Sequence, residues 1–163
     1  MTYNNFIIRE IKQEDNVKIA QTIRTILIEF GVPKVGTAYA DKLLDTLFET
    51  YAIDKAIYYV IEKDGKLYGG AGIKHLDNYK GNVCELQKMY FLPEARGIGL
   101  GSKMMKICLQ KAKEFGFEKC YLETLPYMEN ARKLYKKAGF KNLDGPMGDT
   151  GHYSCNLWML KDL

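Results

Sequence analysis

Residues 96–102 read Arg-Gly-Ile-Gly-Leu-Gly-Ser, so three glycines fall within five positions. An apolar, strand-like segment at 83–92 precedes this stretch, and a helical pattern at 100–115 follows it. Glycines leave the main-chain N–H groups uncovered, and the start of a helix adds unpaired N–H groups and the positive end of its dipole. The stretch therefore predicts a strand–turn–helix unit that binds an anion, most often a phosphate.

The glycine spacing excludes the two commonest phosphate-binding loops. A dinucleotide fingerprint would need glycine where Ser102 or Met104 stands, and a P-loop would need lysine directly after Gly101. The pattern that remains is R-x-x-G-x-G, from Arg96 to Gly101. An ordinary glycine-rich turn between a strand and a helix is the alternative interpretation.

The composition is that of a globular protein, and it argues against some classes of binding partner. Of the 163 residues, 47% are hydrophobic and 27% charged, so we expect a single folded domain over residues 1–163. The net charge of +4 is spread along the chain, which argues against a nucleic-acid partner. No apolar run reaches the length of a membrane span, and residues 1–5 lack the pattern of a signal peptide. We expect a cytoplasmic protein with no membrane partner.

The four cysteines lie in apolar segments, and no two of them have the C-x-x-C spacing. We expect reduced and mostly buried thiols at Cys84, Cys108, Cys120 and Cys155. His152 and Cys155 have a spacing found in metal sites, but two ligands do not make a site, so we expect no metal.

Hydrophobic periodicity and turn signals predict an alternation of strands and helices. The predicted strands lie at 6–11, 56–62, 67–75, 83–92, 119–124, from 140 onward, and 153–160. The predicted helices lie at 19–30 (with cap residues at 14–16), 40–51, 100–115 and 128–138. Glycines at 69, 70 and 72 predict a bulge or a close neighbour. The order β-α-α-β-β-β-α-β-α-β-β implies an α/β protein with a mixed sheet and helices on both faces.

This order resembles the GNAT superfamily of N-acetyltransferases over nearly the whole chain. R-x-x-G-x-G resembles the superfamily's pyrophosphate-binding motif, and residues 91–93, Phe-Leu-Pro, resemble the V-x-P that ends its fourth strand. Residues 130–140, NARKLYKKAGF, resemble its N-x-x-A/x-x-L-Y-x-x-x-G-F segment. The resemblance implies a mostly antiparallel sheet that is splayed between its fourth and fifth strands.

The resemblance also implies acetyl-CoA as cosubstrate. The main-chain N–H groups from 97 to 102, together with Arg96, would hold the pyrophosphate. The backbone of residues 89–91 would bond the pantetheine arm as if it were another strand, and Asn130 would contact the same arm. The implied cofactor-binding set is Met89, Tyr90, Phe91, Arg96, Gly97, Ile98, Gly99, Leu100, Gly101, Ser102 and Asn130.

The implied reaction is direct transfer of an acetyl group to a primary amine of a small molecule or peptide in a ternary complex. Tyr135 would donate a proton to the leaving thiolate, and the N–H of Met89 would stabilise the oxyanion. Glu85, eleven positions before Arg96, is the candidate base. Glu123 on the adjoining strand, or a chain of water molecules, is the alternative.

Several of these roles compete with structural ones. Glu85 could be a solvent-facing strand residue, and Tyr135 could belong to the core. Glu123, Tyr127 and His152 are candidates for the acceptor side, where tyrosines and acidic groups favour a small cationic amine. The second candidate function is a non-catalytic acyl-CoA-binding sensor or docking module. Both a monomer and a homodimer fit the sequence.

Overall fold

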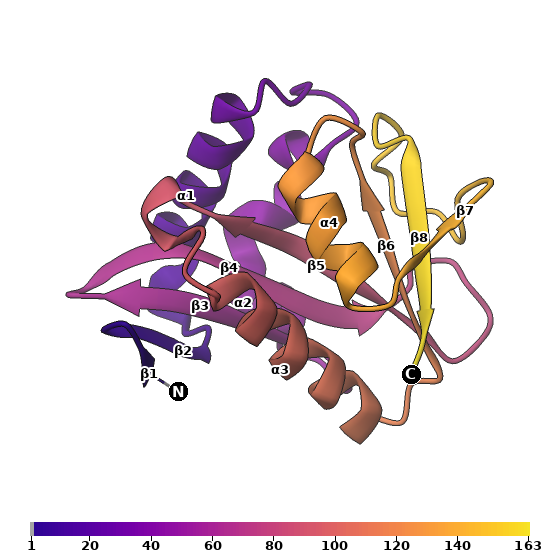
Figure 1. Cartoon of the computed structure of the whole chain (residues 1–163), viewed down its shortest axis with the longest axis horizontal. Coiled ribbons are helices and arrows are strands. Elements are labelled where there is room, and N and C mark those ends of the chain that lie inside the picture. Colours follow the sequence, from indigo (N-terminus) through magenta and orange to yellow (C-terminus); the bar gives the residue numbers. More distant parts are fainter. Residues whose placement is uncertain (1) are drawn as a thin grey trace.

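The computed structural model describes residues 2–163. Their strands form one sheet in the order β1-β2-β3-β4-β5-β6-β8-β7 (Figure 1). The strands are β1 (Thr2–Tyr3), β2 (Phe6–Glu10), β3 (Ile57–Lys63), β4 (Lys66–His75), β5 (Val83–Phe91), β6 (Lys119–Thr124), β7 (Lys141–Leu143) and β8 (Leu157–Asp162). Neighbouring strands run antiparallel except β5 and β6, which run parallel. The predicted mixed and mostly antiparallel sheet is therefore confirmed.

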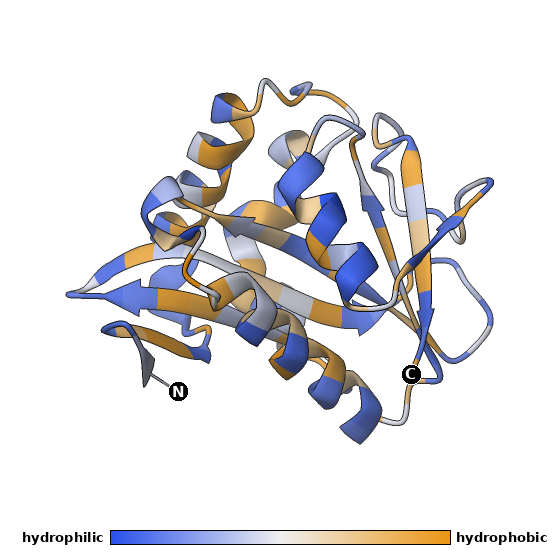
Figure 2. Cartoon of the chain, in the orientation of Figure 1, coloured by the Kyte–Doolittle hydropathy of each residue, from blue (hydrophilic) through white to orange (hydrophobic). Residues whose placement is uncertain are grey.

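Helices cover both faces of this sheet. The α-helices are α1 (Asn16–Glu29), α2 (Leu47–Tyr51), α3 (Leu100–Glu114) and α4 (Glu129–Lys137), and short 3-10 helices lie at Gln13–Asp15, Ala38–Ala40, Lys42–Thr46 and Pro93–Ala95. Side chains of β3 alternate between the faces: Tyr58 and Val60 pack with α1, whereas Tyr59 and Ile61 pack with α3. Figure 2 shows the hydrophilic residues of α3 and α4 on the side away from the sheet.

The predicted helix at 40–51 is mostly wrong. The chain forms short 3-10 turns at 38–40 and 42–46, and only 47–51 is α-helical. Asp41 has an extended backbone, with φ −69° and ψ 114°, and its carboxylate accepts the N–H of Leu43 at 2.9 Å. This local cap interrupts the helix, because an extended residue cannot continue the ladder of hydrogen bonds.

The last strand begins at Leu157 rather than at Tyr153, and β7 begins at Lys141. Residues 152–155 instead form a turn that docks on the loop after α1. Ser154 donates its N–H to the carbonyl of Gly36 at 2.9 Å and its hydroxyl to the carbonyl of Val35 at 2.7 Å. The β3, β4, β5, β6, α3 and α4 boundaries lie within one residue of the predicted ones.

The glycines of β4 make room for a tyrosine that shapes β5. Between Gly70 and Gly72 the register shifts, because β5 carries an extra residue there, and Lys88 has φ +49°. A Cβ on Gly70 or Gly72 would come within 2.6 Å or 2.5 Å of the Tyr58 ring. The Tyr58 hydroxyl donates to the carbonyl of Lys88 at 2.8 Å. The predicted bulge is confirmed, and Tyr58 holds it in place.

The four cysteines are free, and three of them are buried, as predicted. Within residues 2–163, no helix has both the length and the apolar character needed to cross a membrane.

Candidate active site

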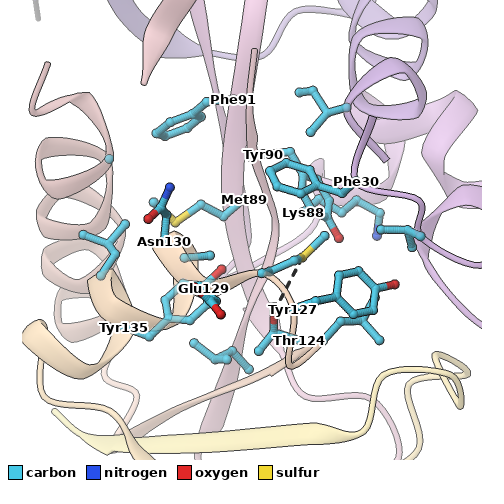
Figure 3. A pocket seen from close by; sticks show the side chains of 18 of the residues that line it. Phe30, Lys88, Met89, Tyr90, Phe91, Thr124, Tyr127, Glu129, Asn130 and Tyr135 are labelled. Carbon is cyan, nitrogen blue, oxygen red and sulfur yellow. Dashed lines mark hydrogen bonds between the residues drawn. The ribbon is translucent and has the colours of Figure 1, made fainter. Parts of the chain in front are cut away.

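A cavity of about 440 Å³ opens where β5 and β6 part. The two strands pair only from Val83–Glu85 to Lys119–Tyr121 and then diverge, as Figure 1 shows. Side chains of both strands, of α4 and of the loop before α3 line this space (Figure 3). We call it the splay cavity. Parted parallel strands leave backbone groups without a strand partner, so the cavity can take an extended ligand.

The glycine-rich loop forms one end of the splay cavity, which reaches Gly97 and Gly101. Gly97 and Gly99 have φ of +72° and +87°, a conformation that favours glycine. None of the six N–H groups from Gly97 to Ser102 donates to another residue that the structure describes. Six free donors at the N-terminus of α3 suit a diphosphate, so this end of the cavity fits the implied cofactor.

Arg96 lies beside this loop, but its guanidinium already has partners. It donates to the carbonyl of Phe91 at 2.8 Å and forms a two-bond ion pair with Glu29 of α1, at 2.8 and 2.9 Å. The guanidinium also lies 4.8 Å from the ring centre of Phe30. Arg96 lines the splay cavity, and its role in holding the pyrophosphate stays a prediction. Its partner Glu29, which ties α1 to the loop, carried no sequence signal.

Helix α4 places Asn130 and Tyr135 on the same side of the splay cavity (Figure 3). Asn130 is exposed, whereas Tyr135 is only 7% exposed. Burial raises the pKa of the Tyr135 hydroxyl, so the group stays protonated at neutral pH. Its hydroxyl makes no hydrogen bond to another described residue. Tyr135 thus contributes to the core with its ring and also lines the cavity.

Glu85 is buried in the wall of the site and is only 3% exposed, so the solvent-facing interpretation is wrong. Its carboxylate accepts the amide N–H of Gln87 at 2.6 Å. Burial raises the pKa of Glu85 to about 7, the bond from Gln87 opposes this rise, and the negative charge of Glu123 adds to it. Glu85 is not among the residues that line the cavities, whereas Gln87 is.

The three acceptor-side candidates fall into two places. Glu123 and Tyr127 line the splay cavity, where the Glu123 carboxylate accepts the hydroxyls of Tyr121, at 2.7 Å, and of Thr150. His152 lines a second cavity of about 370 Å³ next to it, which we call the rim cavity. His152 is nevertheless linked to Glu123, because its N–H donates to the Thr150 hydroxyl at 3.3 Å, and that hydroxyl donates to the Glu123 carboxylate.

The rim cavity contains charged groups that the sequence analysis missed. Asp41 accepts from His152 Nε2 at 3.2 Å and lies 3.5 Å from the ammonium of Lys88. Burial acts against it, but His152 and Lys88 together hold the pKa of the Asp41 carboxyl well below its usual range. Lys88 lies within a strand pattern and Asp41 within a predicted helix, so no sequence signal marked either one.

The sequence matches a known protein family over most of its length. The sequence profile of the Acetyltransferase (GNAT) family matches residues 21–140. The chain belongs to this family. Its GNAT relatives include YjgM, an uncharacterized N-acetyltransferase of Escherichia coli K12, which is 40% identical over 96% of this chain and 95% of its own length.

Solved GNAT structures have the same fold. A GNAT-family acetyltransferase from Staphylococcus aureus Mu50 superposes with a TM-score of 0.85 at 21% identity, covering 97% of this chain and 99% of the other. The structure of yncA from Salmonella typhimurium, solved with its cofactor acetyl-CoA, has a TM-score of 0.77 at 16% identity, covering 98% and 95%. The predicted GNAT fold is confirmed.

Proposed function

We propose that this protein transfers the acetyl group of acetyl-CoA to a primary amine of a small molecule or peptide, by direct attack in a ternary complex. One observation carries the proposal: six free N–H groups lie at the start of α3, in the loop whose Gly97 and Gly101 line the cavity between β5 and β6. Family membership supports the same reaction class.

The residues of the splay cavity divide the work of holding acetyl-CoA, which supplies the reactive thioester. The N–H groups from 97 to 102 bind the diphosphate, because a helix N-terminus and bare amides favour an anion. The backbone of β5 at 89–91, beyond its last pairing with β6, receives the extended arm. Asn130 contacts this arm from α4.

Two groups act at the thioester. Tyr135 donates the proton that the departing thiol requires, and its raised pKa keeps that proton available at neutral pH. The N–H of Met89 stabilises the negative charge that develops on the acetyl oxygen, and such a donor typically lowers the barrier by about 3 kcal/mol. The bulge beside Met89 is rigid because Tyr58 holds the carbonyl of Lys88.

Glu85 accepts the proton of the attacking amine. Its pKa of about 7 gives it a large carboxylate fraction at neutral pH. Glu85 lines neither the splay cavity nor the rim cavity, so we place water between the amine and the Glu85 carboxylate, on the side where Gln87 lines the rim cavity. Glu123, which lines the splay cavity directly, is the alternative base.

The test is release of free thiol from acetyl-CoA in the presence of a panel of primary amines, with the products identified by mass spectrometry. The proposal expects amine-dependent thiol release and N-acetylated products. Tight binding of acetyl-CoA by calorimetry, without thiol release from any amine, would instead favour the non-catalytic acyl-CoA-binding sensor.

A further inference from the structure

The two cavities meet at Lys88. Lys88 and Thr37 are the described residues that line both of them. The side chain of Lys88 is only 4% exposed, and in Figure 3 it lies across the splay cavity from Asn130 and Tyr135. Lys88 also directly precedes Met89, whose N–H we place at the acetyl oxygen. A group held by Lys88 therefore lies close to the attacking amine.

The ammonium of Lys88 has donors to spare. An ammonium carries three N–H donors, and among described residues this one has a single partner, the carboxylate of Asp41 at 3.5 Å. That distance is at the outer limit of a hydrogen bond. A buried cation with one weak partner is costly, and a second anion would satisfy its remaining donors.

Thr37 and Gln87, which lie beside Lys88 at the junction, each already bond to another residue. The hydroxyl of Thr37 donates to the carbonyl of Pro33 at 2.5 Å. The side-chain amide of Gln87 donates to Glu85 at 2.6 Å and accepts from Tyr51. Of the two described residues that line both cavities, Lys88 is the one that carries a positive charge for an anionic partner.

We propose that Lys88 binds a carboxylate of the acceptor, so that the acceptor is a small molecule carrying both a primary amine and a carboxylate, as free amino acids do. This inference rests on the proposed function. Asp41 and His152 position Lys88 from the side of the rim cavity, and the left-handed backbone at Lys88, held by Tyr58, fixes where its side chain starts. The sequence favoured a small cationic amine as acceptor, but an acceptor with positive charge alone would be repelled by the Lys88 ammonium at this junction.

The experiment compares each free amino acid with its primary amide, which keeps the amine and the side chain but loses the negative charge. The quantity measured is the ratio of kcat/KM for acid and amide in the wild type and in Lys88→Met. Because amidation also changes the pKa of the amine itself, this ratio is compared between proteins rather than read alone. We expect Lys88→Met to lower the ratio at least tenfold while acetyl-CoA affinity, measured by calorimetry, stays unchanged.

Lys74 provides the matched control. It also lines the rim cavity, but its ammonium is already paired with Asp77 at 2.9 Å. Lys74→Met should leave the ratio of kcat/KM for acid and amide unchanged. Lys88→Arg should retain most of the wild-type ratio, because it keeps the positive charge. If Lys88→Met does not fold, Lys88→Gln takes its place.

The outcomes separate this inference from the function. An equal loss for acids and amides in Lys88→Met, or a wild type that acetylates diamines in preference to amino acids, would overturn carboxylate recognition and leave the acetyltransferase reaction standing. Thiol release from no amine at all would overturn the proposed function first.

Discussion

Glu85 and Tyr135 differ from ordinary surface side chains because protein replaces water around both. Burial disfavours the charged form of each, so the pKa of the carboxyl rises to about 7 and that of the phenol rises further above its usual range. At neutral pH the Glu85 carboxyl is therefore partly deprotonated, and the Tyr135 phenol is fully protonated. These are the states that their proposed roles as base and acid require.

Replacing Glu85 with glutamine should change stability in a pH-dependent way. The folded-state pKa of about 7 exceeds the value of 4.5 taken for the unfolded chain, so the folded protein binds more protons between these values. The contribution of Glu85 to the free energy of unfolding is therefore fully present below pH 4.5. It is lost as the pH rises through 7, and the total loss is up to about 3 kcal/mol. The free energy of unfolding of Glu85→Gln minus that of the wild type should therefore be larger at pH 8 than at pH 4.5. Urea unfolding of both proteins at the two pH values measures this difference.

The same variant tests the catalytic role. The ratio of wild-type to Glu85→Gln kcat/KM should rise with pH up to about 7 and then level off, because only the carboxylate accepts a proton. Because the acceptor amine titrates in the same way in the assays of both proteins, its titration cancels from this ratio. A ratio that stays flat from pH 5 to 9 would assign the base to Glu123 or to water.

Replacing Tyr135 with phenylalanine removes the proposed acid and keeps the buried ring. Turnover should fall by roughly 100-fold, in the range expected for loss of a general acid. The Kd for acetyl-CoA, measured by calorimetry, should change less than about twofold, because the diphosphate contacts lie at α3. Tyr68→Phe is the control, since Tyr68 packs on Phe6 away from both cavities. Unaltered turnover in Tyr135→Phe would mean that Tyr135 only packs in the core and does not act as the acid.

At the level of elements, the N-terminus of α3 and the splay of β5 from β6 create the site together. The helix start supplies free N–H groups, and the parted strands supply the cavity that reaches this loop at Gly97 and Gly101. Gly97 is needed for its backbone conformation and not for lack of room, because a Cβ added there would meet no atom within 4 Å. That position therefore allows the charge of the loop to be changed without a steric clash.

Gly97→Asp and Gly97→Asn form a matched pair for testing the anion site. Both side chains have nearly the same shape, and both tolerate the left-handed backbone better than most residues do. Only aspartate places a negative charge beside the diphosphate. We expect acetyl-CoA to bind at least tenfold more weakly to Gly97→Asp than to Gly97→Asn. The difference in affinity should become smaller at high salt, because salt screens the added charge. Equal affinities by calorimetry would place the diphosphate elsewhere.

In the whole molecule, α1 and the loop after it link the rim cavity to the glycine-rich loop at the splay cavity. The helix packs on one face of the sheet, and its last residue, Glu29, holds Arg96 beside the glycine-rich loop. The loop that follows α1 is in turn bonded to residues 152–155 at the rim cavity. A single continuous segment thus contacts both cavities.

Glu29→Gln should strengthen acetyl-CoA binding about two- to fivefold at low salt. The substitution removes a negative charge near the bound phosphates and frees Arg96 to contact them, and exposed charges of this kind contribute at most about 1 kcal/mol. The gain should vanish in 1 M salt. Glu94→Gln is the control, because Glu94 is exposed nearby and forms no ion pair with a described residue. Weaker binding in Glu29→Gln would mean that Glu29 positions Arg96 for the cofactor.

The amino-acid sequence alone determined the order of strands and helices along the chain and the place of the glycine-rich loop, whereas the splayed sheet was implied by the resemblance to a known family. The element order and the loop follow from local causes: apolar side chains repeat at the period of their element, and glycines occupy backbone conformations that other residues avoid. Tertiary structure alone decided that Glu85 is buried, that Glu29 holds Arg96 over a separation of 67 residues, and that Asp41 meets His152 over 111. Such contacts depend on how distant segments pack, and no local pattern encodes that arrangement.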